Sequence, residues 1–244
     1  MHHFFVSSAA IRSEKVKFGV DNARQIFRVL RLRAGDRVIV LDNSGQESEV
    51  RLDLVTPQAC EGTVIQTRLS KGEPSTRLTL YLGLTQREKF EWVLQKCTEV
   101  GVAAFVPVVT SRSLVQDIRT VQRKAKRWQA IIREAAEQSG RGILPLLEEP
   151  LLYSQALDAM HQHDLALVAW EDEQTVLLKS ILKKTKPGTV GLLIGPEGGL
   201  SAEEAEEARR SGIQCVSLGK RILRMETAAM VASAFVLHDL GEMG

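Results

Sequence analysis

The chain has 244 residues, of which 44% are hydrophobic and 25% are charged, and its formal net charge is +2. This composition is ordinary for a folded globular protein and argues against a disordered or fibrous chain. No apolar run approaches the roughly 20 residues of a membrane span, and the first residues lack the charged segment and apolar core of a secretory leader. We therefore expect a cytoplasmic protein with no membrane partner.

The sequence contains three widely spaced cysteines, Cys60, Cys97 and Cys215. An odd number without a C-x-x-C pair argues against a disulfide framework and against a zinc site, and it favours a reducing compartment. We expect no bound metal.

The first part of the chain predicts a small β-domain. Residues 36–42, 49–52 and 60–69 alternate or form short apolar runs between turn signals, which indicates short strands and a small barrel. The polar segment 70–75 contains Gly72 and Pro74, so we place a domain boundary between residues 72 and 73. Residues 1–72 carry 11 basic and 8 acidic side chains, a net charge of +3, whereas the remainder carries 21 and 22, a net charge of −1.

Arginines gather ahead of these strands. Residues 21–31 predict a helix on which Arg24, Arg28 and Arg31 share one face, while Ile26, Val29 and Leu30 face inward. Arg33 and Arg37 extend the cluster, and only Asp36 opposes these five arginines. Contact with a polyanion and an ordinary solvated face are equally good interpretations.

From residue 77 onward, predicted strands and helices alternate, which indicates an α/β fold with a mainly parallel sheet. Strands are predicted at 78–84, 103–109 and 164–170, and helices at 88–100 and 118–138. The last predicted helix, 226–239, is apolar nearly all round, so the fold core or a partner subunit must cover it.

Two glycine-containing turns follow successive predicted strands near the end of the chain. The apolar run 190–194 leads into Gly-Pro-Glu-Gly-Gly at 195–199, and Ser201 with Glu204 forms a capping box that starts a helix. A second apolar run, 213–218, leads into the turn at 218–224. Neither turn matches a dinucleotide or P-loop motif, and Glu197 would repel phosphate. The turns therefore predict a ligand that is not led by phosphate, or a tight turn with no ligand.

The residues at 194–199 (IGPEGG) and 218–228 (LGKRILRMETA) closely resemble the signature of RsmE-type RNA methyltransferases. Segments 89–91, 95–101 and 133–141 also resemble that family. The resemblance implies a SPOUT-type parallel sheet with a C-terminal trefoil knot at residues 73–244, preceded by a PUA-like β-barrel RNA-binding domain at residues 1–72. It implies methylation of N3 of a uridine in 16S ribosomal RNA of the small ribosomal subunit, S-adenosylmethionine as cofactor, and a homodimer.

The resemblance also implies the roles of particular residues. Arg224 is expected to stabilise negative charge on the uridine, with Arg221 as the second candidate, and no histidine is expected to act as a base. Glu226 is expected either to orient that arginine or simply to occupy the first turn of the helix, where the dipole favours it. Expected cofactor-binding residues are Leu193, Gly195, Pro196, Glu197, Gly198, Leu218, Gly219, Ile222, Leu223 and Thr227. Expected substrate-binding residues are Arg24, Arg28, Arg31, Arg33, Glu137, Gln138, Arg141 and Arg221. The chain departs from relatives at Gln25, where they usually have histidine, and near His3, where they commonly have arginine.

Two other interpretations of the sequence remain. One is a non-catalytic RNA-binding protein with a decayed methyltransferase fold, against which the intact turns at 195–199 and 219–226 argue. The other is a different α/β nucleotide-binding enzyme, which the missing phosphate-loop residues disfavour. Binding of the cofactor discriminates among the three.

Overall fold

The computed structural model describes residues 1–243, apart from the side chain of Thr120. By their internal contacts these residues form two compact units, and each is described by itself. Unit 1 contains Met1–Glu73 and Arg133–Leu144, and unit 2 contains Pro74–Ile132 and the chain from Pro145 onward. None of the described helices is both long and apolar enough to cross a membrane.

Unit 2 is built on a parallel sheet, as the alternation of predicted elements indicates. Its strands run in the order β10-β8-β7-β12-β11-β13, with β9 paired to β8, and every pairing is parallel. The strands are β7 (Arg77–Gly83), β8 (Ala104–Val109), β9 (Leu146–Leu147), β10 (Leu151–Leu152), β11 (Leu165–Ala169), β12 (Thr189–Ile194) and β13 (Gln214–Val216).

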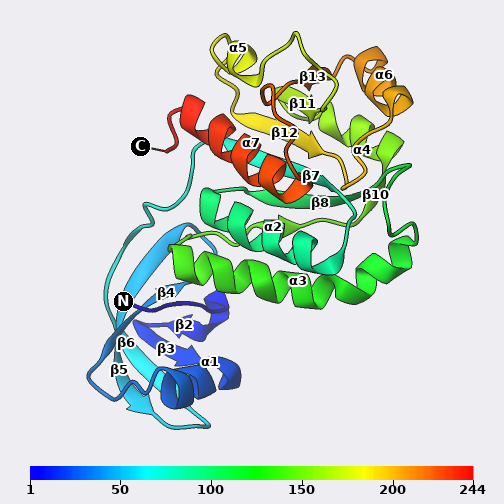
Figure 1. Cartoon of the computed structure of the whole chain (residues 1–244). Helices are drawn as coiled ribbons and strands as arrows, with labels where there is room; N and C mark the ends of the chain where they lie inside the picture. Colours follow the sequence, from blue (N-terminus) through cyan, green and yellow to red (C-terminus); the bar gives the residue numbers. More distant parts are fainter. Residues whose placement is uncertain (244) are drawn as a thin grey trace. The chain divides into compact units, whose positions relative to one another are not determined.

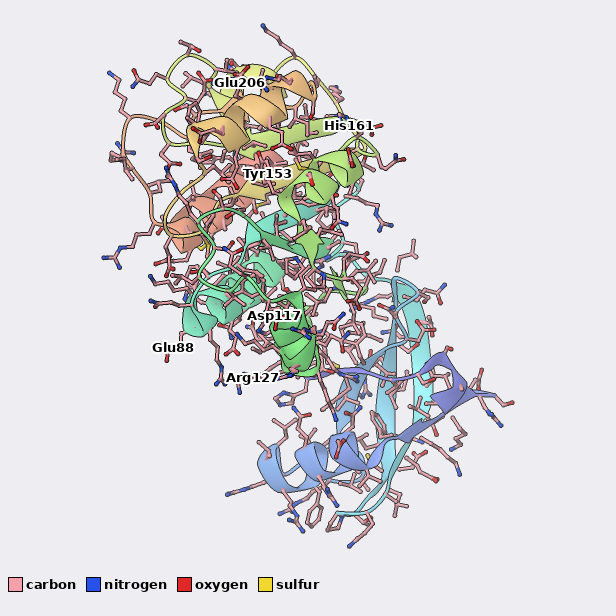
Figure 2. The ribbon with its side chains drawn as sticks, turned by 90° about the vertical axis from the view of Figure 1, so that its right-hand side faces the viewer. Glu88, Asp117, Arg127, Tyr153, His161 and Glu206 are labelled. Atoms are coloured by element: carbon pink, nitrogen blue, oxygen red, sulfur yellow. The ribbon has the colours of Figure 1, made fainter. Side chains whose placement is uncertain are left out.

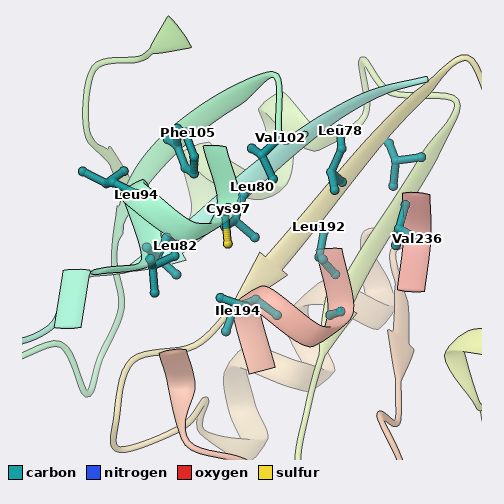
Figure 3. Close-up of a cluster of buried hydrophobic side chains, with 14 of the residues drawn as sticks. Leu78, Leu80, Leu82, Leu94, Cys97, Val102, Phe105, Leu192, Ile194 and Val236 are labelled. Carbon is teal, nitrogen blue, oxygen red and sulfur yellow. The ribbon is translucent and has the colours of Figure 1, made fainter. Parts of the chain in front are cut away.

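Helices cover both faces of this sheet (Figure 1). They are α2 (Arg87–Val100), the first part of α3 (Ile118–Ser139), α4 (Tyr153–Met160), α5 (Leu178–Leu182), α6 (Ala202–Arg210) and α7 (Met225–Asp239). Successive strand residues point to opposite faces, so Leu192 packs with α2 and α7 whereas Leu193 packs with α4 and α6. Figure 3 shows part of the hydrophobic cluster on the face covered by α2 and α7, in which Leu80, Cys97 and Ile194 lie close together.

The start of α6 confirms the predicted capping box. Ser201 is the N-cap, its hydroxyl accepts a hydrogen bond from the Glu204 N–H, and the Glu204 carboxylate accepts one from the Ser201 N–H. These bonds satisfy two amide groups that a helix end leaves free. Tyr153 of α4, labelled in Figure 2, donates a 2.7 Å hydrogen bond to the Glu204 carbonyl, which ties α4 to α6 on the same face of the sheet.

Helix α7 is only partly covered by unit 2. Ala229, Ala232, Val236 and Leu237 are fully buried, whereas the Phe235 side chain is 49% exposed. The helix predicted at 226–239 is therefore confirmed, with its start one residue earlier. The described residues of unit 2 leave one side of this apolar helix open.

Unit 1 contains a mixed sheet in the order β1-β4-β5-β6-β3-β2. Its elements are β1 (His3–Phe5), η1 (Ser8–Ala10), β2 (Ile11–Arg12), β3 (Lys15–Phe18), α1 (Val20–Arg24), η2 (Gln25–Val29), β4 (Arg37–Leu41), β5 (Gln46–Val55) and β6 (Cys60–Leu69). The strand predicted at 60–69 is confirmed residue for residue.

The predicted closed barrel is wrong for this sheet. Among the described residues no pairing joins β1 to β2, so each remains an edge. Strand β1 instead pairs in parallel with β4, and β2 is only two residues long because the turn η1 precedes it directly. So short a strand offers few groups with which to close a barrel.

The predicted arginine helix at 21–31 also differs in detail. It begins at Val20, passes into the π-turn η2 at Gln25, and ends at Val29. The Leu30 N–H donates to the Gln25 carbonyl five residues back, so this turn contains more residues than a turn of an α-helix and shifts the side chains that follow to a different face. Val29 consequently points outward and is 72% exposed, although it was expected to face inward. Arg31 adopts a left-handed φ of 55° beyond the helix, so it does not share the face of Arg24 and Arg28.

The end of α3 and the segment after it complete unit 1, although the predicted boundary assigned them to the second part. The guanidinium of Arg141 binds both carboxylate oxygens of Glu73, at 2.9 Å from Nε and 2.9 Å from Nη2. The Glu73 carboxylate also accepts the Gly142 and Ile143 N–H groups. A buried, bidentate pair of this kind is strongly destabilising to break, so it fixes this segment within the unit.

Candidate functional site

A pocket of about 480 Å³ lies at one edge of the sheet in unit 2. Because β12, β11 and β13 are parallel neighbours, their carboxyl ends meet at the same edge, where α/β folds bind ligands. The loops after these three strands, the first turn of α7 and one residue of α2 form its wall. The residues are Lys89, Ala169, Trp170, Glu171, Ile194, Gly195, Pro196, Glu197, Gly198, Gly199, Ser217, Leu218, Gly219, Lys220, Arg221, Ile222, Leu223, Arg224, Met225, Glu226 and Ala228.

The turn after β12 requires glycine at several positions. Gly199 has φ +69° and donates a 2.9 Å hydrogen bond to the Pro196 carbonyl. A Cβ on Gly199 would lie 1.8 Å from Glu171 Oε1, so the Glu171 carboxylate would have to move, and the positive φ adds backbone strain for any other residue. The Arg112 guanidinium donates a 2.8 Å bond to the Gly198 carbonyl and fixes the turn from outside. The turn is therefore held by hydrogen bonds, and its glycines leave the backbone N–H and C=O groups accessible at the pocket.

The same turn packs tightly against its surroundings at its first residue. A Cβ on Gly195 would lie 3.0 Å from Leu200 Cγ and 3.2 Å from the Gly199 carbonyl carbon. A Cβ on Gly83, at the end of β7, would lie 2.4 Å from the Pro196 nitrogen. Neither position has room for a branched side chain.

The turn after β13 presents its backbone and three basic side chains. Gly219 has φ +120°, which only glycine adopts easily, and its N–H donates to Ser217 Oγ at 3.3 Å. Lys220, Arg221 and Arg224 are exposed. The N-cap of α7 is Arg224, whose side chain makes no capping bond and is free to face the pocket.

Two buried polar atoms in the pocket wall lack partners among the described residues, namely Glu226 Oε2 and Trp170 Nε1. A buried polar atom without a hydrogen bond costs free energy, so such atoms commonly meet a ligand or water. No hydrogen bond or ion pair between Glu226 and Arg224 is found in the described part of the chain, so the expectation that Glu226 orients that arginine has no support in the contacts.

The charges in the pocket wall are mixed. Four cations (Lys89, Lys220, Arg221 and Arg224) face three carboxylates (Glu171, Glu197 and Glu226). Lys89 Nζ lies 2.5 Å from Glu197 Oε1. Burial is the largest single influence on Glu197 and by itself would raise its pKa. The hydrogen bond and the positive charge of Lys89, together with weaker hydrogen bonds, outweigh burial and hold the pKa below its usual value. Glu197 is therefore ionised at neutral pH.

A salt bridge supports the loop that carries Trp170 and Glu171. Arg209 Nη2 lies 2.8 Å from Glu173 Oε2, and its guanidinium carbon lies 5.0 Å from the centre of the Trp170 ring. The other oxygen of Glu173 accepts hydrogen bonds from the Thr175 hydroxyl at 2.6 Å and the Thr175 N–H at 2.8 Å. These bonds, with the smaller effect of Arg209, lower the pKa of Glu173 to about 2.

Replacement of Glu173 by glutamine is expected to lower stability at neutral pH and to change its pH dependence. Because the folded-state pKa is depressed from 4.5 to about 2, the ionised carboxylate stabilises the fold above pH 4.5, and this contribution is lost as the pH falls towards 2. Urea unfolding of parent and Glu173→Gln between pH 7 and pH 3 should give a difference that shrinks below pH 4.5. A difference that stays constant with pH would contradict this account.

Most of the predicted cofactor residues line the pocket. Leu193 and Thr227 do not: Leu193 is fully buried in the core, and Thr227 lies in the first turn of α7 but is not one of the lining residues. Trp170 and Glu171 were missed, although the end of the strand predicted at 164–170 points to them. Lys89 was not among the predicted site residues, because nothing in the helix pattern shows that α2 begins beside the turn after β12. The described pocket wall contains no histidine.

The predicted substrate residues lie in different environments. Arg24, Arg28, Arg31 and Arg33 are exposed in unit 1, and Arg221 is exposed at the pocket. Arg141 is only 3% exposed and paired to Glu73, which disagrees with the expected substrate contact of its side chain. Glu137 and Gln138 line a separate hollow in unit 1.

The described residues show neither a metal-binding site nor a reactive thiol. Among the described residues no group of three or more His, Cys, Asp or Glu side chains is placed to hold a metal ion. The three cysteines are buried and unpaired, and burial raises the pKa of Cys97 to about 12 and that of Cys60 to about 11. Such thiols are protonated and unreactive at neutral pH.

Comparison with known proteins gives consistent matches. Residues 72–237 match a family model described as an RNA methyltransferase domain. The chain is 33% identical over 226 residues to the ribosomal RNA small subunit methyltransferase E of Bacillus subtilis, covering 90% of this chain and 88% of the relative. It is 37% identical over 209 residues to the protein of the same name from Synechocystis, covering 85% of this chain and 67% of the relative.

A solved structure is similar over the whole chain. The crystal structure of a ribosomal RNA small subunit methyltransferase E from Neisseria gonorrhoeae bound to S-adenosyl methionine has a TM-score of 0.87 and 30% sequence identity to this chain. The match covers 98% of this chain and 97% of the other.

Proposed function

The chain belongs to the RNA methyltransferase family that includes the ribosomal RNA small subunit methyltransferases E, and from this premise we propose that it methylates N3 of a uridine in 16S ribosomal RNA with S-adenosylmethionine as cofactor. The observation that carries the proposal is the pocket at the carboxyl ends of β11, β12 and β13, with its glycine turns and its two buried polar atoms without partners.

The pocket residues fit this cofactor. Its volume of about 480 Å³ is within the range of roughly 300–1,000 Å³ typical of small-molecule sites. S-adenosylmethionine carries an amino group, a carboxylate, ribose hydroxyls and an adenine ring. Glu226 Oε2 is an acceptor for an amino or hydroxyl group, and Trp170 Nε1 is a donor for a carboxylate or ring nitrogen.

The backbone of the turns after β12 and β13 would make most of the contacts with the cofactor. Glycines allow the closest approach of N–H and C=O groups to a ligand. The residues that would hold it are Gly195, Pro196, Glu197, Gly198, Leu218, Gly219, Ile222 and Leu223. Leu193 would act from the core by fixing the end of β12, and Thr227 by fixing the first turn of α7. The Lys89–Glu197 pair lies at the wall and would keep the Glu197 carboxylate ionised, as a partner for either the sulfonium or a ribose hydroxyl.

The bound cofactor supplies an activated methyl group on a sulfonium sulfur. Methylation at N3 requires that the N3 proton be lost. Loss of this proton leaves negative charge on the O2 and O4 atoms of the base. Arg224, exposed at the pocket and free of ion pairs with described residues, would stabilise that charge. Arg221 lies three residues earlier on the same wall and is the second cation available to the base.

Unit 1 is proposed to bind the ribosomal RNA, in the role of the PUA-like domain. Its support is the group of four exposed arginines, Arg24, Arg28, Arg31 and Arg33, of which only Arg24 has a recorded side-chain ion pair within the described structure, a 3.9 Å contact with Asp21. Cationic side chains at a surface bind RNA phosphates and make the affinity dependent on salt. The open sheet does not affect this role, because the arginines belong to the helical segment and to the loop after it.

Further properties of the family are proposed for this chain. A trefoil knot would thread the loops that form the pocket, which is consistent with three such loops meeting at one edge of the sheet. A homodimer would cover the open side of α7, where Phe235 is half exposed. The substrate and the unpaired cysteines support a cytoplasmic location.

Transfer of labelled methyl groups tests the proposal. The protein is incubated with methyl-labelled S-adenosylmethionine and either small or large ribosomal subunits that lack the modification. The proposal expects label in the RNA of the small subunit alone. Equal labelling of both subunits, or none of either by a protein that binds the cofactor, would contradict it.

A further inference from the structure

A second hollow, of about 280 Å³, lies within unit 1. It is formed by the start of the chain through β1, by η2 with the residue after it, and by the last turns of α3. Its residues are Met1, His2, His3, Phe4, Gln25, Leu30, Glu134, Glu137 and Gln138. It is smaller than the roughly 300–1,000 Å³ of sites for drug-sized molecules, so it suits a fragment about the size of one nucleobase.

The side chains around the hollow are apolar at its base and polar above. Phe4 is 1% exposed and Leu30 is half-buried, so both present apolar surface from within the unit. Gln25, Glu134 and Gln138 are exposed, and His3 and Glu137 are half-buried. An aromatic and aliphatic floor below hydrogen-bonding groups is the arrangement by which proteins hold unstacked RNA bases.

The lining contains the carboxylates of Glu134 and Glu137, two histidines and the N-terminal residue Met1, and no lysine or arginine side chain. Burial lowers the pKa of His3, so this imidazole is neutral at pH 7. Glu137 Oε1 accepts hydrogen bonds from the Phe5 N–H at 2.9 Å and from Arg133 Nε at 3.3 Å, whereas its Oε2 has no hydrogen bond to any described residue. Burial raises the pKa of Glu137, an effect that these two bonds oppose. The lining therefore offers carboxylate acceptors to the donor groups of a neutral ligand.

Exposed arginines lie on the helical segment that contributes Gln25 to the hollow. Gln25 lines it, and Arg24 and Arg28 come from the same helical segment and are exposed. Phe27 is 41% exposed between them and offers an aromatic ring to a neighbouring base. An RNA strand whose phosphates lie along these arginines could therefore place one base in the hollow.

We propose that this hollow binds one unstacked guanine of the RNA substrate. Guanine is the base whose Watson–Crick edge presents two adjacent donors, N1–H and N2–H₂, and a carboxylate presents two adjacent acceptors. Glu134 and Glu137 would accept from these donors while Phe4 and Leu30 pack against the ring. The proposal rests on the proposed function in that the ligand is taken to be RNA, and it adds a base-reading site that lies outside the methyl-transfer pocket.

The test measures binding of short RNAs to the full-length protein without cofactor. Fluorescence anisotropy at low salt compares a labelled heptamer, UUUGUUU, with the same RNA carrying inosine or adenine at the central position. Inosine lacks only the N2 amino group of guanine. The guanine RNA is expected to bind about tenfold more tightly than the inosine RNA, since a lost member of a good bidentate pair commonly has this effect.

Three variants locate the preference. Glu134→Gln replaces an exposed carboxylate that has no recorded bond to another described side chain, and Gln25→Trp fills the hollow from its rim; circular dichroism checks that both are folded. Both should reduce the guanine-over-inosine ratio to about one, as expected for loss of the paired contact. Glu61→Gln, on β6 and away from the hollow, is the matched control and should keep the ratio.

Equal affinity of the parent for the guanine and inosine RNAs would overturn the proposal, as would a preference that persists in folded Gln25→Trp. These outcomes are separate from the methyl-transfer assay. Methylation of small subunits without a guanine preference would support the proposed function and overturn this inference. A guanine preference without methyl transfer would support this inference and contradict the proposed function.

Discussion

Replacing Gly195 with valine is expected to weaken binding of S-adenosylmethionine by about 10- to 100-fold, the range that overpacking of 1–3 kcal/mol implies. A Cβ alone would already lie 3.0 Å from Leu200 Cγ and 3.2 Å from the Gly199 carbonyl carbon. The branched side chain must therefore displace the turn after β12 or project into the pocket. Calorimetric titration of parent and variant with the cofactor measures the loss.

A matched control lies at the other end of the same strand. Gly188 directly precedes β12, is exposed, and would place a Cβ no closer than 3.4 Å to another group, the Asp164 carboxylate. Gly188→Val should bind the cofactor as the parent does. If Gly195→Val is folded and retains the parent's affinity, the turn after β12 does not hold the cofactor.

Replacement of Arg224 with alanine is expected to lower the turnover number by about 100- to 1,000-fold, as removal of one charge-stabilising group does in other enzymes. Affinity for S-adenosylmethionine should change little, because the backbone of the two turns makes the proposed contacts with it. The helix should also remain intact, since the Arg224 side chain makes no capping bond to α7. Single-turnover methyl transfer to small subunits separates this effect from RNA binding.

Two further arginine variants sharpen the assignment. Arg221→Ala removes the neighbouring cation of the pocket wall and should reduce turnover less than Arg224→Ala does. Arg210→Ala removes an exposed arginine of α6 that lies outside the pocket wall and should leave turnover unchanged. A larger loss in Arg221→Ala than in Arg224→Ala would transfer the charge-stabilising role to Arg221.

The elements of unit 2 could be predicted because each is specified by a local pattern. The Ser201–Glu204 capping box marks the start of α6, and Gly101, with φ +120°, ends α2 where the sequence placed its stop. Parallel strands also imply that their carboxyl ends meet, so the two glycine turns could be expected to share a site. The same reasoning, applied to the end of β11, would also have predicted Trp170 as a site residue.

Other features depend on contacts between distant segments, which no local pattern shows. Lys89 reaches the pocket because α2 begins beside the turn after β12. The hollow of unit 1 needs the end of α3 to lie against β1, where Glu137 accepts a hydrogen bond from the Phe5 N–H. The π-turn at Gln25–Val29 could not be seen either, because apolar spacing in so short a segment does not separate it from an α-helix.

The position of the methyl group, N3 of uridine, is tested most directly by the nucleoside composition of the methylated RNA. Small ribosomal subunits lacking the modification are incubated with the protein and S-adenosylmethionine, and their RNA is digested to nucleosides for mass spectrometry. The account predicts one new nucleoside, 3-methyluridine, formed by the parent and strongly reduced with Arg224→Ala. A methyl group on a ribose oxygen, on carbon 5 of uridine or on another base would contradict it.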